Sequence, residues 1–151
     1  MIKKKIAVED IISFLDKEVI AVKGSCENCY IDNIPDAQHV EETSLDWVNS
    51  SKANKQEIAE NSPAKVLVVD ENIEFSPSLN DKGKTLLVVK KPRKIMALVA
   101  SHFFIKKQEP GIHPSAVIDE DADIDESAHI SAGCVIGRAK IGKNTVLCFV
   151  G

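Results

Sequence analysis

The sequence predicts a small α/β domain followed by the first coils of a parallel β-helix. Before Pro110, segments with the period of helices and segments with the period of strands alternate along the chain. From Ile112 onward an aliphatic residue recurs at about every sixth position, and a small residue stands two positions before each later one. Hexapeptide periods are typical of parallel β-helices. We therefore assign residues 1–108 to the α/β domain and residues 109–151 to the coils.

The first part of the α/β domain is expected to contain two helices and three short strands. Residues 8–17 place four aliphatic side chains on one helical face, namely Val8, Ile11, Ile12 and Leu15. β-Branched and aromatic residues predict strands over 18–22, 29–34 and 44–50. A polar helix should follow, with Ser50 or Ser51 as its N-cap and Pro63 beyond its end.

The second part of the domain contains the strongest strand signals. Residues 65–70 and 84–90 are continuous aliphatic runs, which indicate strands buried on both faces. Residues 80–83 read as a turn between them. Pro92 suits the first turn of a helix, which should extend over 92–104. Because helices separate the strands, the sheet should be partly parallel.

The sixfold stretch fits a chain coiled as a triangular prism with short strands as its sides. The isoleucines should point inward and be buried, and the small residues should fit near the axis. The inward isoleucines are Ile118, Ile124, Ile130, Ile136 and Ile141. The five-residue step from Ile136 to Ile141 indicates a contraction at one corner. A run of β-hairpins is disfavoured, because it would need more frequent turn signals. Since the sequence stops at Gly151 within a repeat, we expect a truncated β-helix.

Composition restricts the class of protein. The chain has 151 residues and a formal net charge of -4, which argues against nucleic-acid binding. It has no apolar run of the roughly 20 residues that a membrane span needs, and no secretory signal, so we expect a cytoplasmic protein. Cys26 and Cys29 have metal-like spacing, but no second pair completes a site. We expect neither a metal nor a cofactor.

Four segments, in this order, resemble the UDP-3-O-acylglucosamine N-acyltransferase family of lipid A (lipopolysaccharide) biosynthesis. "DNIPDAQHVEETSLDWVNSSK" resembles the segment in which "LSF" leads to "NPKY", and "AKVLVVDEN" resembles the next strand. "LLVVKKPRKIMALVASHFF" resembles "LVVxNPRxAFAxLLxLF", and "GIHPSAVID" resembles the beginning of the first coil. The resemblance covers nearly the whole chain.

The resemblance implies a left-handed β-helix of hexapeptide repeats, a homotrimer and an N-acyltransferase. Such an enzyme moves a 3-hydroxyacyl chain from acyl carrier protein to the amine of a UDP-linked acylated glucosamine. A histidine on a later coil acts as the general base. The family's α/β domain holds the uracil with an aromatic residue and an asparagine.

Transferred to this chain, the resemblance places Trp47 at the uracil-stacking position, with Asn49 or Ser50 at the asparagine position. Ala53 stands at the family's tyrosine, and Lys91-Pro92 stands at its "NP". No catalytic residue is assigned, because none of the four histidines matches the base: His39, His102, His113 and His129. We therefore expect the 151-residue chain alone to be inactive.

Two other functions stay open. The chain could belong to an N-acyltransferase for another nucleotide-linked amino sugar, since Ser50, Ala53 and Lys91 depart from the family pattern. It could also be a non-catalytic domain that binds a nucleotide or a partner and uses the coils as an oligomerising stalk.

Overall fold

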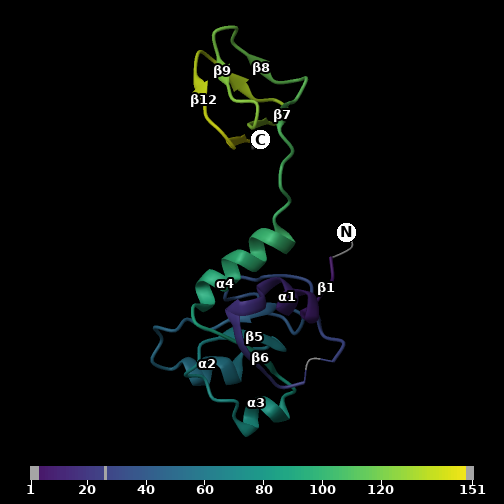
Figure 1. Cartoon of the computed structure of the whole chain (residues 1–151), viewed down its shortest axis with the longest axis vertical. Coiled ribbons are helices and arrows are strands. Elements are labelled where there is room, and N and C mark those ends of the chain that lie inside the picture. The colour runs from purple at the N-terminus through teal and green to yellow at the C-terminus, as the bar shows by residue number, and fades with distance from the viewer. Residues whose placement is uncertain (1–3, 26, 149–151) are drawn as a thin grey trace. The chain divides into compact units, whose positions relative to one another are not determined.

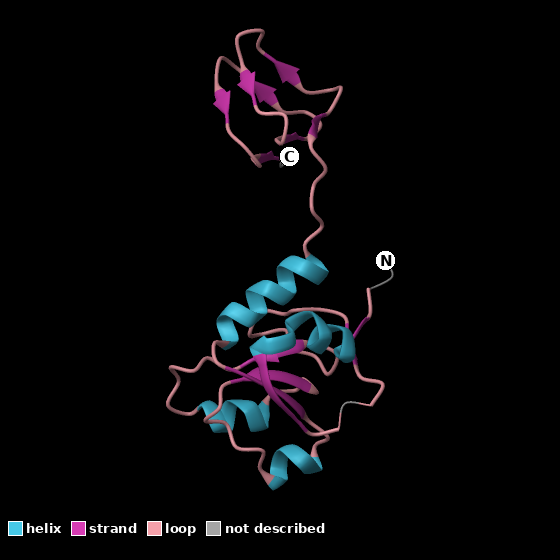
Figure 2. Cartoon of the chain, viewed as in Figure 1, coloured by secondary structure: helices cyan, strands magenta, loops and turns pink. Residues whose placement is uncertain are grey.

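A computed structural model describes residues 4–25 and 27–148, and the chain divides into two compact units, Met1–Ile105 and Lys106–Gly151. The first unit is a mixed α/β structure and the second consists of short parallel strands (Figures 1 and 2). The predicted α/β class with parallel strand pairing is confirmed. Within the described residues, no helix is long and apolar enough to cross a membrane.

The first unit contains a four-stranded sheet in the order β2-β6-β5-β4. Strands β4, β5 and β6 are parallel, and β2 pairs with β6 in the antiparallel direction. A separate antiparallel pair joins β1 to β3. The strand bounds are β1 Ile6–Ala7, β2 Val19–Lys23, β3 Tyr30–Ile31, β4 Leu45–Trp47, β5 Val66–Val69 and β6 Thr85–Val89.

Helices cover both faces of this sheet (Figure 2). Side chains of α1 and α4 pack with Val66, Val68 and Leu87 on one face. Side chains of α2 and α3 pack with Leu67 and Val69 on the other. The alternation explains why β5 and β6 are continuous aliphatic runs. The helix bounds are α1 Val8–Leu15, α2 Lys55–Asn61, α3 Pro77–Asp81 and α4 Pro92–Val99, with a short 3-10 helix η1 at Asp16–Glu18 and a π-helical turn η2 at Ala100–Phe104.

Several predicted boundaries were wrong. Helix α2 begins only at Lys55 with Asn54 as its N-cap, so neither Ser50 nor Ser51 caps it, and the Ser51 hydroxyl is bound to Asn49 instead. The turn expected over 80–83 overlaps α3, whose N-cap Ser76 accepts a hydrogen bond from the Leu79 amide. The strands expected over 29–34 and 44–50 shrink to two and three residues.

A buried lysine closes the end of helix α2. Lys84 is 4% exposed, and its Nζ donates to the carbonyls of Ser62 and Ala64 at 2.5 Å each. The final carbonyls of a helix have no partner within the helix, so this cation satisfies backbone groups that would otherwise be buried alone. Burial, with the nearby cations Lys65 and Lys82, lowers the pKa of Lys84.

A tight contact fixes the turn that follows β2. Gly24 has φ +97°, and a Cβ at this position would lie 2.2 Å from the carbonyl oxygen of Lys84. Only glycine combines this left-handed backbone with so close an approach to a neighbouring strand.

The part of the second unit that the structure describes contains seven two-residue strands, which pair in parallel. Gly111 pairs with His129 and Val117 with Val135, so the chain returns to the same side after eighteen residues. Asp123 pairs with Lys140, one residue sooner, which is the predicted contraction. This pairing is compatible with the start of a β-helix. The strands are β7 Gly111–Ile112, β8 Val117–Ile118, β9 Asp123–Ile124, β10 His129–Ile130, β11 Val135–Ile136, β12 Lys140–Ile141 and β13 Val146–Leu147.

The predicted burial of the isoleucines holds for only part of the set. Ile130 and Ile136 are buried, whereas Ile118, Ile124 and Ile141 are half-buried. Strand β10 is the one described strand of this unit with a neighbour on each side, since it pairs with both β7 and β13. Ile130 therefore has a residue stacked above and below it, and the half-buried isoleucines have a stacked residue on one side.

Replacing Ile130 by alanine should destabilise the repeat unit by about 2–5 kcal/mol, because it leaves a cavity in its most enclosed layer. Val135→Ala is the control: this side chain is 77% exposed, so its loss should change stability by less than about 0.5 kcal/mol. Urea titrations followed by the amide NMR signals of residues 111–147 measure both. Equal effects of the two substitutions would contradict the inward packing of Ile130.

Candidate functional site

The candidate site is a cleft at the carboxyl ends of the three parallel strands of the first unit. Trp47 is the last residue of β4, Asp70 follows β5 and Lys90 follows β6. In open α/β sheets, ligands bind beyond the carboxyl ends of parallel strands. The cleft has a volume of about 650 Å³ and is lined by Trp47, Asn49, Ser50, Ser51, Lys90, Lys91, Pro92, Arg93, Lys94 and Ala97.

The three residues that the sequence assigns to uracil, Trp47, Asn49 and Ser50, line this one cleft. Trp47 is half-buried: part of it packs on the core between the sheet and helices α1 and α4, and it also lines a second hollow beside Ser62 and Pro63. The helix at 92–99 therefore does not enclose the indole. Ala53 is exposed and does not line the cleft.

The side chains of Asn49 and Ser50 differ in their availability. The Oδ1 atom of Asn49 accepts hydrogen bonds from the amide and hydroxyl of Ser51, at 3.0 and 2.8 Å. The two N–H donors of the Asn49 side-chain amide take no part in these bonds. Ser50, in contrast, also lines the adjoining hollow, beside Asp70. Within the described residues, the amide nitrogen of Asn49 has no hydrogen-bond partner, so it can donate to a ligand.

One wall of the cleft is strongly cationic. Lys90, Lys91, Arg93 and Lys94 belong to the segment that joins β6 to the first turn of α4. Lys94 pairs with Glu18 at 2.8 Å, because the antiparallel β2 begins beside the end of β6. Within the described part of the chain, Lys90, Lys91 and Arg93 make no ion pair. The family pattern at Lys91-Pro92 predicts no role for these cations, although the run "KKPRK" before a helix is a usable signal for them.

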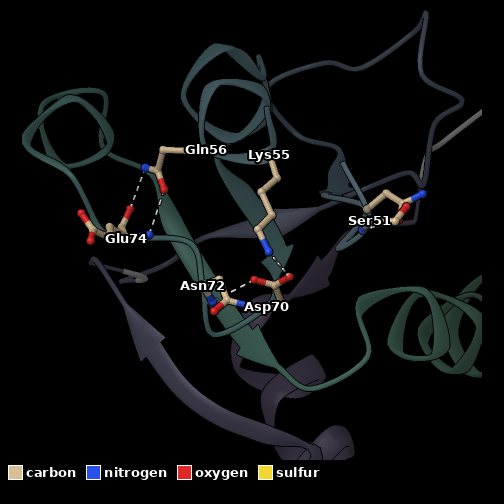
Figure 3. Close-up of polar contacts among 7 residues, drawn as sticks. Ser51, Lys55, Gln56, Asp70, Asn72 and Glu74 are labelled. Carbon is tan, nitrogen blue, oxygen red and sulfur yellow. Dashed lines mark hydrogen bonds and ion pairs between the residues drawn. The ribbon is translucent and has the colours of Figure 1, made fainter. Parts of the chain in front are cut away.

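A smaller polar hollow of about 290 Å³ adjoins the cleft and shares Ser50 and Lys90 with it. At its base lies Asp70, which is 6% exposed. Its Oδ2 atom lies 2.8 Å from Nζ of Lys55, and its Oδ1 atom accepts a 2.8 Å hydrogen bond from the Asn72 amide (Figure 3). Sequence reasoning missed Asp70 and Lys55, because residues 15 positions apart in different elements carry no shared local signal.

The pKa of Asp70 reflects two opposing effects. Burial raises it, but hydrogen bonds from Lys55, the Asn72 amide and Ser50 outweigh burial and hold the pKa below its ordinary value. The carboxylate is thus ionised in the folded protein at neutral pH.

The four histidines lie outside the cleft. His39 is exposed and pairs with Asp36 at 2.7 Å, and His102 stacks on Phe14 with ring centroids 4.0 Å apart. His113 and His129 belong to the repeat unit, where His129 contacts the Glu109 carbonyl and the Ser131 hydroxyl. Among the described residues, no group of three or more His, Cys, Asp or Glu side chains could hold a metal ion; Cys26 lies outside the described residues.

Comparison with known proteins identifies relatives of this chain. It is 30% identical over 105 residues, 65% of its length, to a UDP-3-O-acylglucosamine N-acyltransferase of Polynucleobacter asymbioticus. It is 51% identical over 49 residues, 32% of its length, to the protein of that name from Granulibacter bethesdensis, and 32% identical over 90 residues, 57% of its length, to that from Bordetella parapertussis. These matches cover 30%, 14% and 24% of the relatives, so the chain spans less than a third of their length. No protein-family model matches the chain.

These relatives define the class of protein: the chain matches part of an acyltransferase. The resemblance predicted from the sequence is confirmed, since the chain fits a fragment of the UDP-3-O-acylglucosamine N-acyltransferase family.

The Asp70 carboxylate should make the stability of the first unit depend on pH. A carboxyl whose pKa is depressed by folding contributes stability above its unfolded pKa, about 3.9, and this stability is lost as the pH falls through the folded pKa. Between pH 5 and pH 3 the wild type should therefore lose more stability than Asp70→Asn. Denaturant unfolding followed by Trp47 fluorescence measures this difference. Parallel curves for the two proteins would show that Asp70 is not responsible.

Proposed function

We propose that the first unit binds the nucleotide of a UDP-linked amino sugar and serves as the substrate-holding part of an N-acyltransferase of lipid A synthesis. One observation carries the proposal: Trp47, Asn49 and three cations that have no ion-pair partner among the described residues share one cleft. The chain also fits a fragment of this acyltransferase family. The larger cytoplasmic enzyme would transfer a 3-hydroxyacyl chain from acyl carrier protein to the glucosamine amine.

The indole of Trp47 suits the base of the nucleotide. Stacking of a base on an aromatic side chain contributes about 1–3 kcal/mol to the binding free energy. A single stacking face does not discriminate between bases. Selectivity for uracil then needs a hydrogen bond. The free donors of Asn49 can reach a uracil carbonyl, while its Oδ1 atom stays bound to Ser51.

The cations suit the diphosphate. Lys90, Lys91 and Arg93 stand on the cleft wall with their charges uncompensated by other described residues. Hydrogen bonds between such cations and phosphate oxygens are charge-assisted and stronger than neutral ones. A uridine with more phosphates should therefore bind more tightly than one with fewer.

The repeat unit fits the proposal as the first coils of a left-handed β-helix, which would form a homotrimer in the larger enzyme. The sixfold pattern and the parallel pairing of strands seventeen or eighteen residues apart support this assignment. The handedness and the trimer follow from the family resemblance.

Titration of the chain with uridine, UMP and UDP tests the nucleotide site. Trp47 is the only tryptophan, so each ligand should quench its fluorescence in a saturable manner. We expect Kd values of about a millimolar for UDP, which corresponds to about 4 kcal/mol, and progressively weaker binding for UMP and uridine. The variant Lys91→Ala/Arg93→Ala should bind all three ligands about equally.

The matched control for charge is Lys17→Ala/Lys106→Ala, which removes two exposed cations outside the cleft and should preserve the UDP, UMP and uridine order. Absence of quenching at several millimolar UDP would reject the nucleotide site. Tighter binding of dTDP than of UDP would instead favour an N-acyltransferase for another nucleotide-linked amino sugar.

A further inference from the structure

The loop between β4 and α2, residues 48–54, supplies three residues of the cleft: Asn49, Ser50 and Ser51. It contains no helix or strand, so its shape must come from other contacts. Inside the loop, the Asn49 carbonyl accepts a hydrogen bond from the Lys52 amide at 3.1 Å, and Asn49 Oδ1 binds Ser51. These bonds shape the turn itself, while its beginning is attached to the sheet by Val48, which is buried and donates its amide to the Val68 carbonyl at 3.0 Å.

A second attachment involves Asp70, which lies directly beyond β5. Its carboxylate pairs with Lys55, the first residue of α2, and lines the same hollow as Ser50, near the beginning of the loop. Asp70 therefore holds the end of the loop and adjoins its beginning. Asp70 is itself held by the Asn72 amide, on the turn that leaves the sheet (Figure 3).

The burial of this contact makes it strong and specific. The side chains of Lys55 and Asp70 are only 20% and 9% exposed. Breaking a buried ion pair by removing one partner leaves a charge without compensation, which is far more costly than losing an exposed pair. Helix α2 lacks a side-chain hydrogen bond at its N-cap Asn54, and its first turn is held by Lys55 together with Gln56, whose side chain makes two hydrogen bonds with the Glu74 backbone at 2.9 and 3.0 Å.

We propose that Asp70 is a positioning residue, which fixes the end of the 48–54 loop through Lys55 so that Asn49 is held toward the cleft. Asp70 does not need to touch the nucleotide. Its effect is to pre-organise the loop, which reduces the conformational entropy lost on binding. The expected effect on nucleotide binding rests on the proposed function, whereas the fixed conformation of the loop is a property of the free protein.

The test combines two measurements on the same variants: Asp70→Asn, Lys55→Met and Ser50→Ala. Hydrogen exchange detected by NMR reports on the free loop, and UDP titration of Trp47 fluorescence reports on binding. In Asp70→Asn and Lys55→Met, the amides of Ser51 and Lys52 should exchange about tenfold faster, while the amides of β5 and β6 keep their protection. The Kd for UDP should rise about tenfold in parallel.

Two further variants separate positioning from general stability. Lys55→Arg keeps the ion pair and should retain both loop protection and UDP affinity. Glu42→Gln removes the same charge as Asp70→Asn, but from the exposed pair with Lys65 at 3.6 Å, and should leave the loop and the affinity unchanged. Ser50→Ala removes a loop contact without leaving a buried charge, and should raise loop exchange by a smaller factor.

The proposal would be overturned if Asp70→Asn showed the same loop exchange and the same UDP affinity as the wild type. If Asp70→Asn does not fold, Lys55→Met serves for the same comparison. A uniform loss of protection across β5, β6 and the loop would also overturn it, because it would show a general structural role. If UDP does not bind to the wild type, the proposed function fails, and the exchange data alone decide whether Asp70 fixes the loop.

Discussion

The parallel alignment of β4, β5 and β6 is the constraint on which the candidate site depends. Three strands that run in one direction end at one edge of the sheet, where β4 ends in an aromatic residue and β5 and β6 are each followed by a charged one. Trp47, Asp70 and Lys90 come from segments far apart in the sequence and meet for this reason alone. The antiparallel β2 adds Glu18 to the same edge, since an antiparallel neighbour begins where the others end.

At this edge the structure also distinguishes two polar residues, Asn49 and Ser50, that were equivalent candidates in the sequence. Asn49 and Ser50 are adjacent in one loop, and either could have faced a ligand. The structure binds the Oδ1 atom of Asn49 to Ser51 and, within the described residues, leaves the amide donors of Asn49 unpaired, while Ser50 also lines the hollow that contains Asp70. The two neighbouring polar residues are thus placed in different surroundings.

The features that the sequence predicted well are those with a local cause. Continuous aliphatic runs predicted β5 and β6 because both of their faces are covered, and the sixfold period predicted the parallel pairing of the second unit. The errors have a tertiary cause. Ser51 does not cap α2 because Asn49 engages it, and the burial of each isoleucine depends on packing within the coils, so Ile118 is half-buried although its pairing partner Ile136 is buried. Helix α3 was missed, although Ser76 followed by Pro77 was a sufficient local signal.

The placement of the aromatic residues has a spectroscopic consequence. The chain has one tryptophan and one tyrosine, Trp47 and Tyr30, and both belong to the α/β unit. Intrinsic fluorescence and absorbance near 280 nm therefore follow the unfolding of that unit, while the repeats from Lys106 onward can melt or assemble without changing either signal. A tryptophan introduced at Val135, whose side chain points into solvent, would give the coils a reporter of their own.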